Sequence, residues 1–346
     1  MMRLPWFRYL TPNSVEEAVT ILANEGPDAM IVAGGTDLLP NMKRKHQVPR
    51  TLVALRDVGE LRRTANGNGL SLGAALTLTD LTRNANVRER YPGLWQAAIQ
   101  VATPHLRNMG TLGGNLCLDT RCTYYNQNYE WRRAIGFCMK KEGETCWVAP
   151  ASKRCLAVSS TDTAPALISL DARVTLVSKD GEREIAVRDL YENDGINYLK
   201  RRPDELLTRV TLGAARGWRS TYWKLRRRGS FDFPVLSVAA AARFSGDGTV
   251  EDARIVLGAV ASSPLVADDA AKTLVGKTLT DSAIVEAGEL ASKPAKPMDN
   301  TDFTLHWRKK VASEFVGYAL RELRRDDMRE TRIRIAQHDL EGAASI

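Results

Sequence analysis

The chain has 346 residues, of which 44% are hydrophobic and 26% are charged. This composition is ordinary for a soluble globular protein with apolar material for two domains, and it excludes a disordered or fibrous chain. No run approaches the roughly 18 apolar residues that span a bilayer, and residues 1–10 lack the apolar centre of a signal peptide. We therefore expect a cytoplasmic protein.

The net charge of +8 is compatible with a nucleic-acid, membrane or acidic partner. The basic residues are nonetheless scattered, and their densest runs are 43–45, 226–228 and, with interleaved acids, 321–334. No combination of basic and aromatic residues typical of nucleic-acid binding accompanies them. These charges are better explained as solvated or subunit-facing groups.

The first elements alternate between helix and strand. Ser14 and Glu17 form a capping-box pattern, which predicts a helix that ends at Gly26, before a proline. Short apolar runs at 30–33 and 51–55 predict buried strands. The first stretch is therefore β/α in character.

The next elements lead to a second glycine-rich turn. Residues 70–75 predict a strand, Thr79 or Asp80 predicts the start of a short helix, and Pro92 begins a helix that packs by one face. A glycine turn at 110–115 follows.

Regular periodicity disappears over residues 118–157, where tyrosine and tryptophan crowd together with four of the five cysteines. A loop of this length without its own periodicity needs something else to order it. A metal centre would do so.

Regular patterns return at 164–170 and 172–177, and small and polar residues at 213–218 indicate a domain boundary. A sheet covered by helices is expected beyond that boundary, followed by a polar tail after Arg325. The expected strands are 221–225, 236–244 and 254–260, and the expected helices are 267–274, 281–291 and 304–323.

Two glycine turns are candidates for binding an anion. Glycine lets the backbone approach a bulky anion closely, and consecutive exposed amides form an anion-binding nest. One such turn is weak evidence, but two, at 34–37 and 111–115, favour a pyrophosphate site. Neither turn matches the Rossmann fingerprint or the phosphate-binding loop of nucleotide triphosphatases, so these classes are disfavoured.

The cysteines indicate a metal or redox role, because disulfides are unexpected in a cytoplasmic chain of this size. Their spacing fits neither a ferredoxin nor a zinc ribbon, so the residues alone predict only a metal site. The four histidines share no ligand spacing, and no Ser-His-Asp or Cys-His arrangement is evident, so no catalytic residue is assigned. The four candidate ligands, separated by 15, 7 and 8 residues, are Cys122, Cys138, Cys146 and Cys155.

Residues 32–38 (VAGGTDL) and 107–115 (RNMGTLGGN) resemble the two flavin-binding segments of the FAD subunit in the xanthine dehydrogenase, or molybdenum hydroxylase, family. The resemblance spans about residues 5 to 325. Its further matches are Asp162, Pro165, Leu167, Lys224, 254–258, Pro264, Leu274 and Gly276.

The resemblance implies an α+β fold with an FAD-binding region at 1–215, made of subdomains at about 1–58 and 59–215. A C-terminal domain at 216–325, with a three-stranded antiparallel sheet and helices, and a polar tail at 326–346 would follow. Asp162 would bond the ribityl chain, and Leu207 and Lys224 would lie near the isoalloxazine. The implied FAD site consists of Val32, Ala33, Gly34, Gly35, Thr36, Asp37, Leu38, Thr111, Leu112, Gly113, Gly114, Asn115, Asp162, Leu207 and Lys224.

The insertion at 118–157 is similar to one branch of this family, that of the flavin subunit of 4-hydroxybenzoyl-coenzyme A reductase. The match at its entrance is 113–127 (GGNLCLDTRCTYYNQ). In that branch the loop carries a 4Fe–4S cluster, and four thiolates make a complete ligand set. Cys117 would be a buried thiol beside the flavin segment, although it could replace Cys122 as a ligand.

The resemblance implies electron transfer in a complex with a large molybdopterin subunit and a small subunit with two 2Fe–2S clusters, as a dimer of heterotrimers. Reduced ferredoxin would supply electrons for dehydroxylation of an aromatic acyl-coenzyme A. Three alternatives remain: an oxidative hydroxylating dehydrogenase, a zinc-stabilised scaffold subunit without catalysis, and a stand-alone flavin oxidase.

Overall fold

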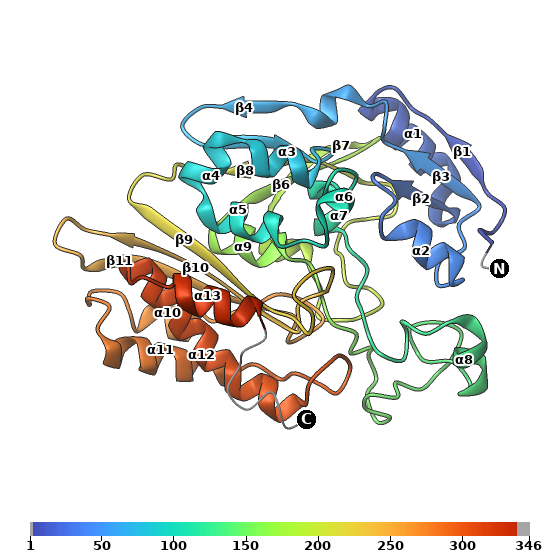
Figure 1. Cartoon of the computed structure of the whole chain (residues 1–346). Coiled ribbons are helices and arrows are strands. Elements are labelled where there is room, and N and C mark those ends of the chain that lie inside the picture. The colour runs from blue at the N-terminus through green and yellow to red at the C-terminus, as the bar shows by residue number, and fades with distance from the viewer. Residues whose placement is uncertain (1–2, 338–346) are drawn as a thin grey trace.

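The computed structural model describes residues 3–337, which form three sheets in sequence along the chain (Figure 1). The N-terminal subdomain contains a parallel sheet in the order β1-β3-β2. Its elements are β1 (Arg8–Leu10), α1 (Val15–Glu25), β2 (Ala29–Val32), α2 (Leu38–Lys43) and β3 (Thr51–Ala54).

The start of α1 confirms the capping prediction. The Ser14 hydroxyl accepts from the Glu17 amide at 3.1 Å, and the Glu17 carboxylate accepts from the Asn13 amide at 2.8 Å. The buried face of the helix, Ala18, Val19 and Leu22, packs on the sheet. Gly26, with φ of 58°, ends the helix as expected.

The second subdomain contains an antiparallel sheet in the order β4-β5-β8-β6-β7, with short helices beside it. The predicted helix start at Thr79 or Asp80 is wrong by two to three residues, because the Thr77 hydroxyl caps the helix through the Asp80 amide at 3.0 Å. The elements are β4 (Thr64–Asn66), β5 (Leu70–Gly73), α3 (Leu78–Arg83), α4 (Ala85–Arg90), α5 (Pro92–Ile99), α6 (Pro104–Arg107), α7 (Leu112–Leu116), α8 (Tyr129–Ala134), α9 (Thr163–Ser169), β6 (Arg173–Ser178), β7 (Gly181–Ala186) and β8 (Leu206–Leu212).

The C-terminal part contains the predicted antiparallel sheet, with three long strands and a two-residue strand at one edge, in the order β12-β11-β10-β9. The β11 strand begins at Val250, four residues before the predicted start, since it pairs with β10 as far as Phe244. The elements are β9 (Trp218–Leu225), β10 (Leu236–Phe244), β11 (Val250–Gly258), β12 (Leu265–Val266), α10 (Asp268–Lys272), α11 (Asp281–Ser292), α12 (Leu305–Arg324) and α13 (Arg329–Ala336).

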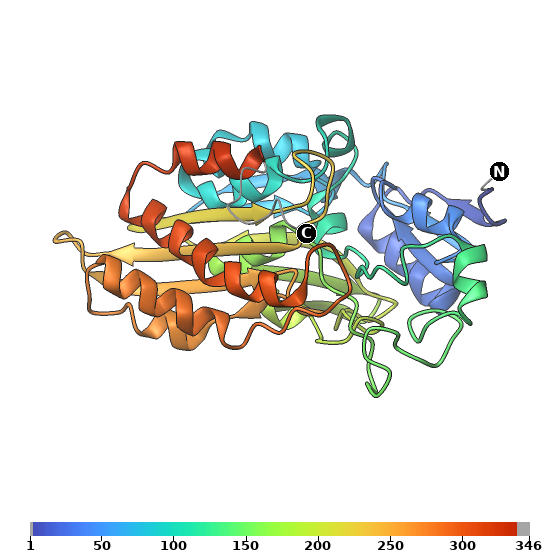
Figure 2. The same cartoon turned by 60° about the horizontal axis from the view of Figure 1, so that its bottom comes forward.

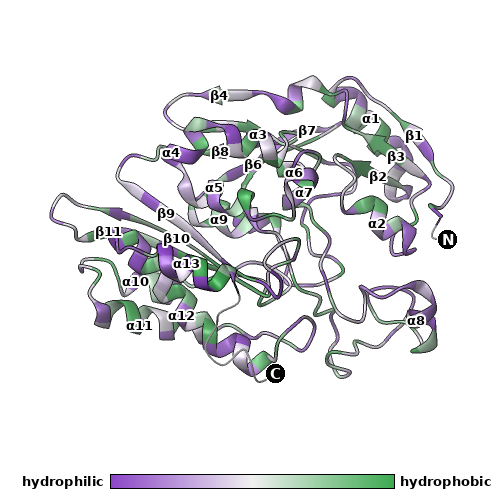
Figure 3. Ribbon diagram, viewed as in Figure 1, coloured by the Kyte–Doolittle hydropathy of each residue, from purple (hydrophilic) through white to green (hydrophobic). Residues whose placement is uncertain are grey.

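The strand β10 lies between two cores. Val238, Ala240 and Ala242 face the core of the C-terminal helices, whereas Ala239 faces the core of the second subdomain. This alternation follows from the two-residue period of a strand. Helices α11 and α12 lie on one face of the sheet (Figure 2). Apolar and polar residues alternate along both helices (Figure 3). The sheet therefore joins the two halves of the chain through shared buried surface.

The segment expected to be a polar tail contains α13 within the described residues. Arg332 fixes this helix, because its guanidinium lies 4.0 Å from the Trp223 ring centroid and bonds to Glu322 at 2.5 Å. Residues 338–346 of the expected tail lie outside the described part. Among residues 3–337, no helix is long and apolar enough to cross a membrane.

Candidate functional site

The first glycine segment connects β2 to α2. A Cβ on Gly34 would overlap the carbonyl oxygen of Met109, so only glycine allows the two glycine segments to approach this closely. Gly35 has a backbone φ of 70°, a value that residues with a side chain rarely adopt. Glycine is therefore required at the two positions for different reasons. Gly34 allows the close approach of the two segments, and Gly35 allows the left-handed backbone conformation.

The amides of this first segment are available to a ligand. Within residues 3–337, the backbone amides of Gly34, Gly35 and Thr36 donate to no other protein atom. Three consecutive free amides are the donors that a pyrophosphate requires. The segment therefore fits the diphosphate of a dinucleotide.

The second glycine segment begins α7 and faces the first. The Thr111 hydroxyl caps the helix by accepting from the Gly114 amide at 3.1 Å. The amides of Leu112 and Gly113 donate to carbonyls of the second subdomain at 2.9 and 2.8 Å. These amides hold the segment in place, so they are not the ones available to a ligand.

Asn115 connects this segment to the start of α9. Its side-chain oxygen accepts from the Thr161 hydroxyl at 2.9 Å and from the Thr163 hydroxyl at 2.7 Å. Asp162 lies between these two threonines. Asn115 thus places Asp162 beside the second glycine segment.

Asp162 and Lys224 form a fully buried ion pair at 3.0 Å, between α9 and β9. The other Asp162 oxygen accepts from the Tyr222 hydroxyl at 2.6 Å, and Lys224 also donates to the Gln100 carbonyl at 3.0 Å. Burial raises the pKa of Asp162 and lowers that of Lys224. The pair therefore joins the flavin-binding region to the C-terminal sheet.

Three other residues that were expected to contact the flavin lie in regular elements next to these loops. Leu207 is buried in β8, in the core of the second subdomain, and its contact with the flavin stays a prediction. Val32 ends β2, and Leu38 begins α2.

The insertion is a loop closed at its neck. Arg121 and Val158 exchange backbone hydrogen bonds at 2.8 and 2.7 Å, which bring the two ends of the loop together. The Arg121 side chain is buried and pairs with Asp37 of the first glycine segment, and it donates to Asn41 at 3.0 Å. The neck of the cysteine loop therefore contacts the first glycine segment directly.

The four candidate cysteines meet inside this loop. All are 5–7% exposed, none forms a disulfide, and together they line one small cavity. Tyr124 and Tyr125 line the same cavity, whereas Trp131 does not. The cysteines brought together are Cys122, Cys138, Cys146 and Cys155.

Burial and a backbone hydrogen bond act in opposite directions on the pKa of the Cys155 thiol. The Ala157 amide donates to the Cys155 sulfur at 3.5 Å. Burial nevertheless raises the pKa of Cys122 to about 12 and that of Cys155 to about 11. The free thiols of Cys122 and Cys155 are therefore protonated at neutral pH, and a bound metal would displace these protons.

The sulfur atoms surround a cavity rather than a single point. Among residues 3–337, no three histidine, cysteine or acidic side chains lie close enough to share one metal ion. Cys117 lies outside the cavity, packed against the core of the second subdomain, and burial raises the pKa of its thiol. The structure thus separates Cys117 from the four.

Three residues that sequence reasoning missed surround the site: Arg121, Lys140 and Gly195. Lys140 lies two positions after Cys138, and it bonds to Gly195 in a distant loop of the second subdomain. No local pattern distinguishes Gly195. Only the long-range contact with Cys155 identifies it.

Gly195→Ala should displace Cys155. A Cβ at this position would lie 2.6 Å from the Cys155 sulfur and 2.8 Å from the Ala157 amide. Any metal bound by the four cysteines should then be lost, while the glycine segments keep their contacts. Metal and flavin content of the variant would check this, with Gly213→Ala as the control, because its Cβ meets nothing within 4 Å.

The free amides of the first glycine segment fit a protein that binds a dinucleotide. Residues 5–214 match the family model of the FAD binding domain in molybdopterin dehydrogenase, and residues 220–323 match the CO dehydrogenase flavoprotein C-terminal domain. The chain therefore belongs to the molybdenum hydroxylase family, as an FAD-binding subunit.

Several relatives support this assignment. The chain is 34% identical to the aldehyde oxidoreductase FAD-binding subunit PaoB of Escherichia coli, over 75% of this chain and 82% of that protein. It is 29% identical to the carbon monoxide dehydrogenase medium chain of Afipia carboxidovorans, over 91% and 95% of the two chains. The structure of a Cu,Mo-CO dehydrogenase superposes with a TM-score of 0.77 at 28% identity, over 94% of this chain and 99% of that one.

These comparisons confirm the FAD-binding subunit and its fold, including the C-terminal antiparallel sheet. The assignment to the reductase branch, the iron–sulfur cluster and the individual flavin contacts stay predictions.

Proposed function

We propose that the chain holds one FAD between its glycine segments and a 4Fe–4S cluster between its four buried cysteines, and that it relays electrons between them. One observation carries the proposal: four buried, unpaired cysteines from a loop whose regular structure is limited to α8 line the same cavity. The neck of that loop contacts the flavin-binding segment through Arg121 and Asp37.

The arrangement of the sulfur atoms supports a cluster over zinc. A single zinc ion requires its ligands around one point, and no three candidate ligands among residues 3–337 are so placed. A 4Fe–4S cluster is bound by four thiolates, each on a different iron, so the sulfurs stand further apart. The Ala157 amide donor to Cys155 matches the hydrogen bonds that stabilise cluster thiolates.

Bound FAD would supply redox chemistry that no side chain of this chain provides. The chain's residues would hold it: the free amides of Gly34, Gly35 and Thr36 at the diphosphate, and Asp162 and Lys224 toward the ribityl chain and ring. The ion pair gives that end of the site a fixed orientation. Leu207 would contribute apolar surface near the ring.

The partners follow from the relatives, whose names describe medium chains and FAD-binding subunits of larger enzymes. We propose a large molybdopterin subunit, where substrate reacts, and a small subunit with two 2Fe–2S clusters, assembled as a dimer of heterotrimers. No catalytic residue is then needed on this chain.

Two directions of electron flow are candidates, each favoured by a specific observation. The cysteine loop resembles that of 4-hydroxybenzoyl-coenzyme A reductase, which favours entry of electrons from ferredoxin and reductive dehydroxylation of an aromatic acyl-coenzyme A. The relatives named above favour the oxidative direction, with aldehyde oxidation as the activity of one of them. In that direction electrons leave through FAD.

Iron, acid-labile sulfide and flavin content of anaerobically purified chain test the cofactor proposal. We expect about four iron, four sulfide and one FAD per chain. Cys122→Ser should lower the iron content at least several-fold and leave the FAD in place, whereas Cys117→Ser should retain both, since Cys117 lies outside the cavity. FAD with stoichiometric zinc and no iron would contradict the cluster and favour the scaffold alternative.

Turnover of the assembled complex distinguishes the two directions. Aldehyde-dependent reduction of an artificial acceptor, with no reaction toward 4-hydroxybenzoyl-coenzyme A under a low-potential donor, would establish the oxidative assignment. The reverse pattern would establish the reductase. Turnover by this chain alone would contradict both and indicate a stand-alone oxidase.

A further inference from the structure

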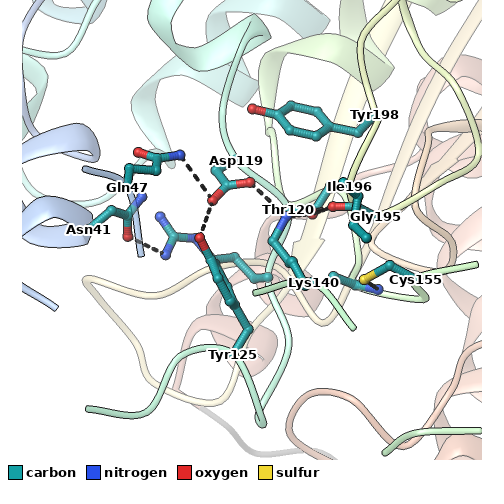
Figure 4. A network of polar contacts seen from close by, with 12 residues as sticks. Asn41, Gln47, Asp119, Thr120, Tyr125, Lys140, Cys155, Gly195, Ile196 and Tyr198 are labelled. Atoms are coloured by element: carbon teal, nitrogen blue, oxygen red, sulfur yellow. Dashed lines mark hydrogen bonds and ion pairs between the residues drawn. The ribbon is translucent and has the colours of Figure 1, made fainter. Parts of the chain in front are cut away.

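A buried lysine lies at the edge of the cysteine cavity. Lys140 and Asp119 form an ion pair at 2.8 Å, with side chains 6% and 5% exposed (Figure 4). Lys140 also donates to the Thr120 hydroxyl at 2.7 Å and to the Gly195 carbonyl at 2.5 Å. Its three hydrogens are therefore all engaged, and its position is fixed.

Asp119 is held on its other side by one residue of the cysteine loop and one of the N-terminal subdomain. Its second oxygen accepts from the Tyr125 hydroxyl at 3.0 Å and from the Gln47 amide at 3.3 Å. The pair cannot rotate without breaking these contacts.

The two members of the ion pair differ in their position relative to the cavity. Lys140 lines the cavity together with the four cysteines, whereas Asp119 does not. Gly195 bridges the pair to the nearest thiol, since its carbonyl accepts from Lys140 and its amide donates to the Cys155 carbonyl at 2.9 Å. Within the pair, Lys140 is therefore the member that adjoins the cavity of the four cysteines.

Water screens this charge little. The Lys140 nitrogen lies 4.8 Å from the Tyr125 ring centroid and 5.4 Å from that of Tyr198. Interactions between charges in such surroundings are several-fold stronger than in water.

We propose that Lys140 sets the reduction potential of the cluster, by presenting a buried positive charge at its Cys155 side, and that Asp119 is the positioning residue that holds it there. The inference rests on the proposed cluster. Reduction by one electron converts one ferric iron to ferrous and makes the cluster one unit more negative, with no bond broken and no proton moved. A fixed positive charge stabilises that reduced form and raises the potential.

The test is an EPR-monitored redox titration of the full chain, with dithionite as the one-electron source and mediators. Lys140→Met should make reduction of the cluster about tenfold less favourable. For one electron, this lowers the midpoint potential by roughly 59 mV. Asp119→Asn should raise it, because the lysine charge is then uncompensated. Lys140→Arg should keep it near the wild-type value.

Lys141→Met is the matched control, since it removes the same charge one residue away, where Lys141 is part-exposed and paired with Glu142. Its potential should not change. A purely structural role for the pair predicts the same direction for both variants, or loss of iron from both, and either result overturns the proposal. If Lys140→Met alone loses iron, an unchanged potential in Asp119→Asn overturns it. Wild-type chain without iron and sulfide would instead refute the cluster itself.

Discussion

Gly34→Ala is expected to leave the purified chain without FAD. The added Cβ overlaps the Met109 carbonyl, a backbone atom that cannot swing aside, so the two glycine segments must separate. Overpacking of this kind costs about 1–3 kcal/mol of stability, and separation misaligns the free amides with the rest of the site. FAD content after gel filtration, read from the flavin-to-protein absorbance ratio, should fall at least about tenfold.

Gly67→Ala is the control for this variant. A Cβ there meets no atom within 4 Å, and the backbone needs no left-handed conformation. Its FAD content should equal that of the wild type. Full FAD content in Gly34→Ala would show that the contact between the glycine segments does not shape the flavin site.

The second large effect is expected from Lys224→Met. It leaves the buried Asp162 carboxylate with the Tyr222 hydroxyl as its remaining side-chain partner. Breaking a buried pair on one side costs about 3–5 kcal/mol. Denaturant unfolding should show this loss near neutral pH.

The loss should shrink as the pH is lowered. Burial already raises the pKa of Asp162 beside Lys224, and removal of the lysine raises it further. A carboxyl whose folded pKa is raised favours the folded state at low pH, and this contribution disappears as the pH rises through that pKa. A pH-independent loss would contradict the assignment of the effect to charge.

Two further variants separate charge from packing. Asp162→Asn/Lys224→Met removes both charges and should recover most of the stability. Lys277→Met breaks an exposed pair with Glu286, whose side chain is 52% exposed, and should cost less than about 1 kcal/mol. A double variant as unstable as Lys224→Met would show that the lysine acts through packing alone.

Much of the secondary structure was predictable from local patterns. The bounds of β10 agree with the predicted strand at 236–244, and α12 begins after the Thr304 cap as the helical pattern indicates. Such elements are specified by periodicity and capping over a few residues. The helix start at Thr77 was missed because Thr79 and Asp80 offer a similar local signal, and only the bonds in the folded chain select one of them.

The candidate site was predictable only in part. The two glycine segments stand out because glycine repeats are rare and have a physical meaning. Sequence could not show that Gly34 abuts Met109, or that Leu112 and Gly113 use their amides within the protein. Those facts depend on contacts between segments that are far apart in the sequence.

By itself, the sequence determined the local elements, the two glycine turns and a cysteine-rich loop without hydrophobic periodicity. The tertiary structure decided which four of the five cysteines meet, and it placed Lys140, Gly195 and Arg121 around them. The physical reason is the difference in sequence separation between the interactions concerned. Periodicity and capping act over a few residues, whereas a buried site is assembled by packing between distant segments, where any lysine or glycine looks like any other until its neighbours are known.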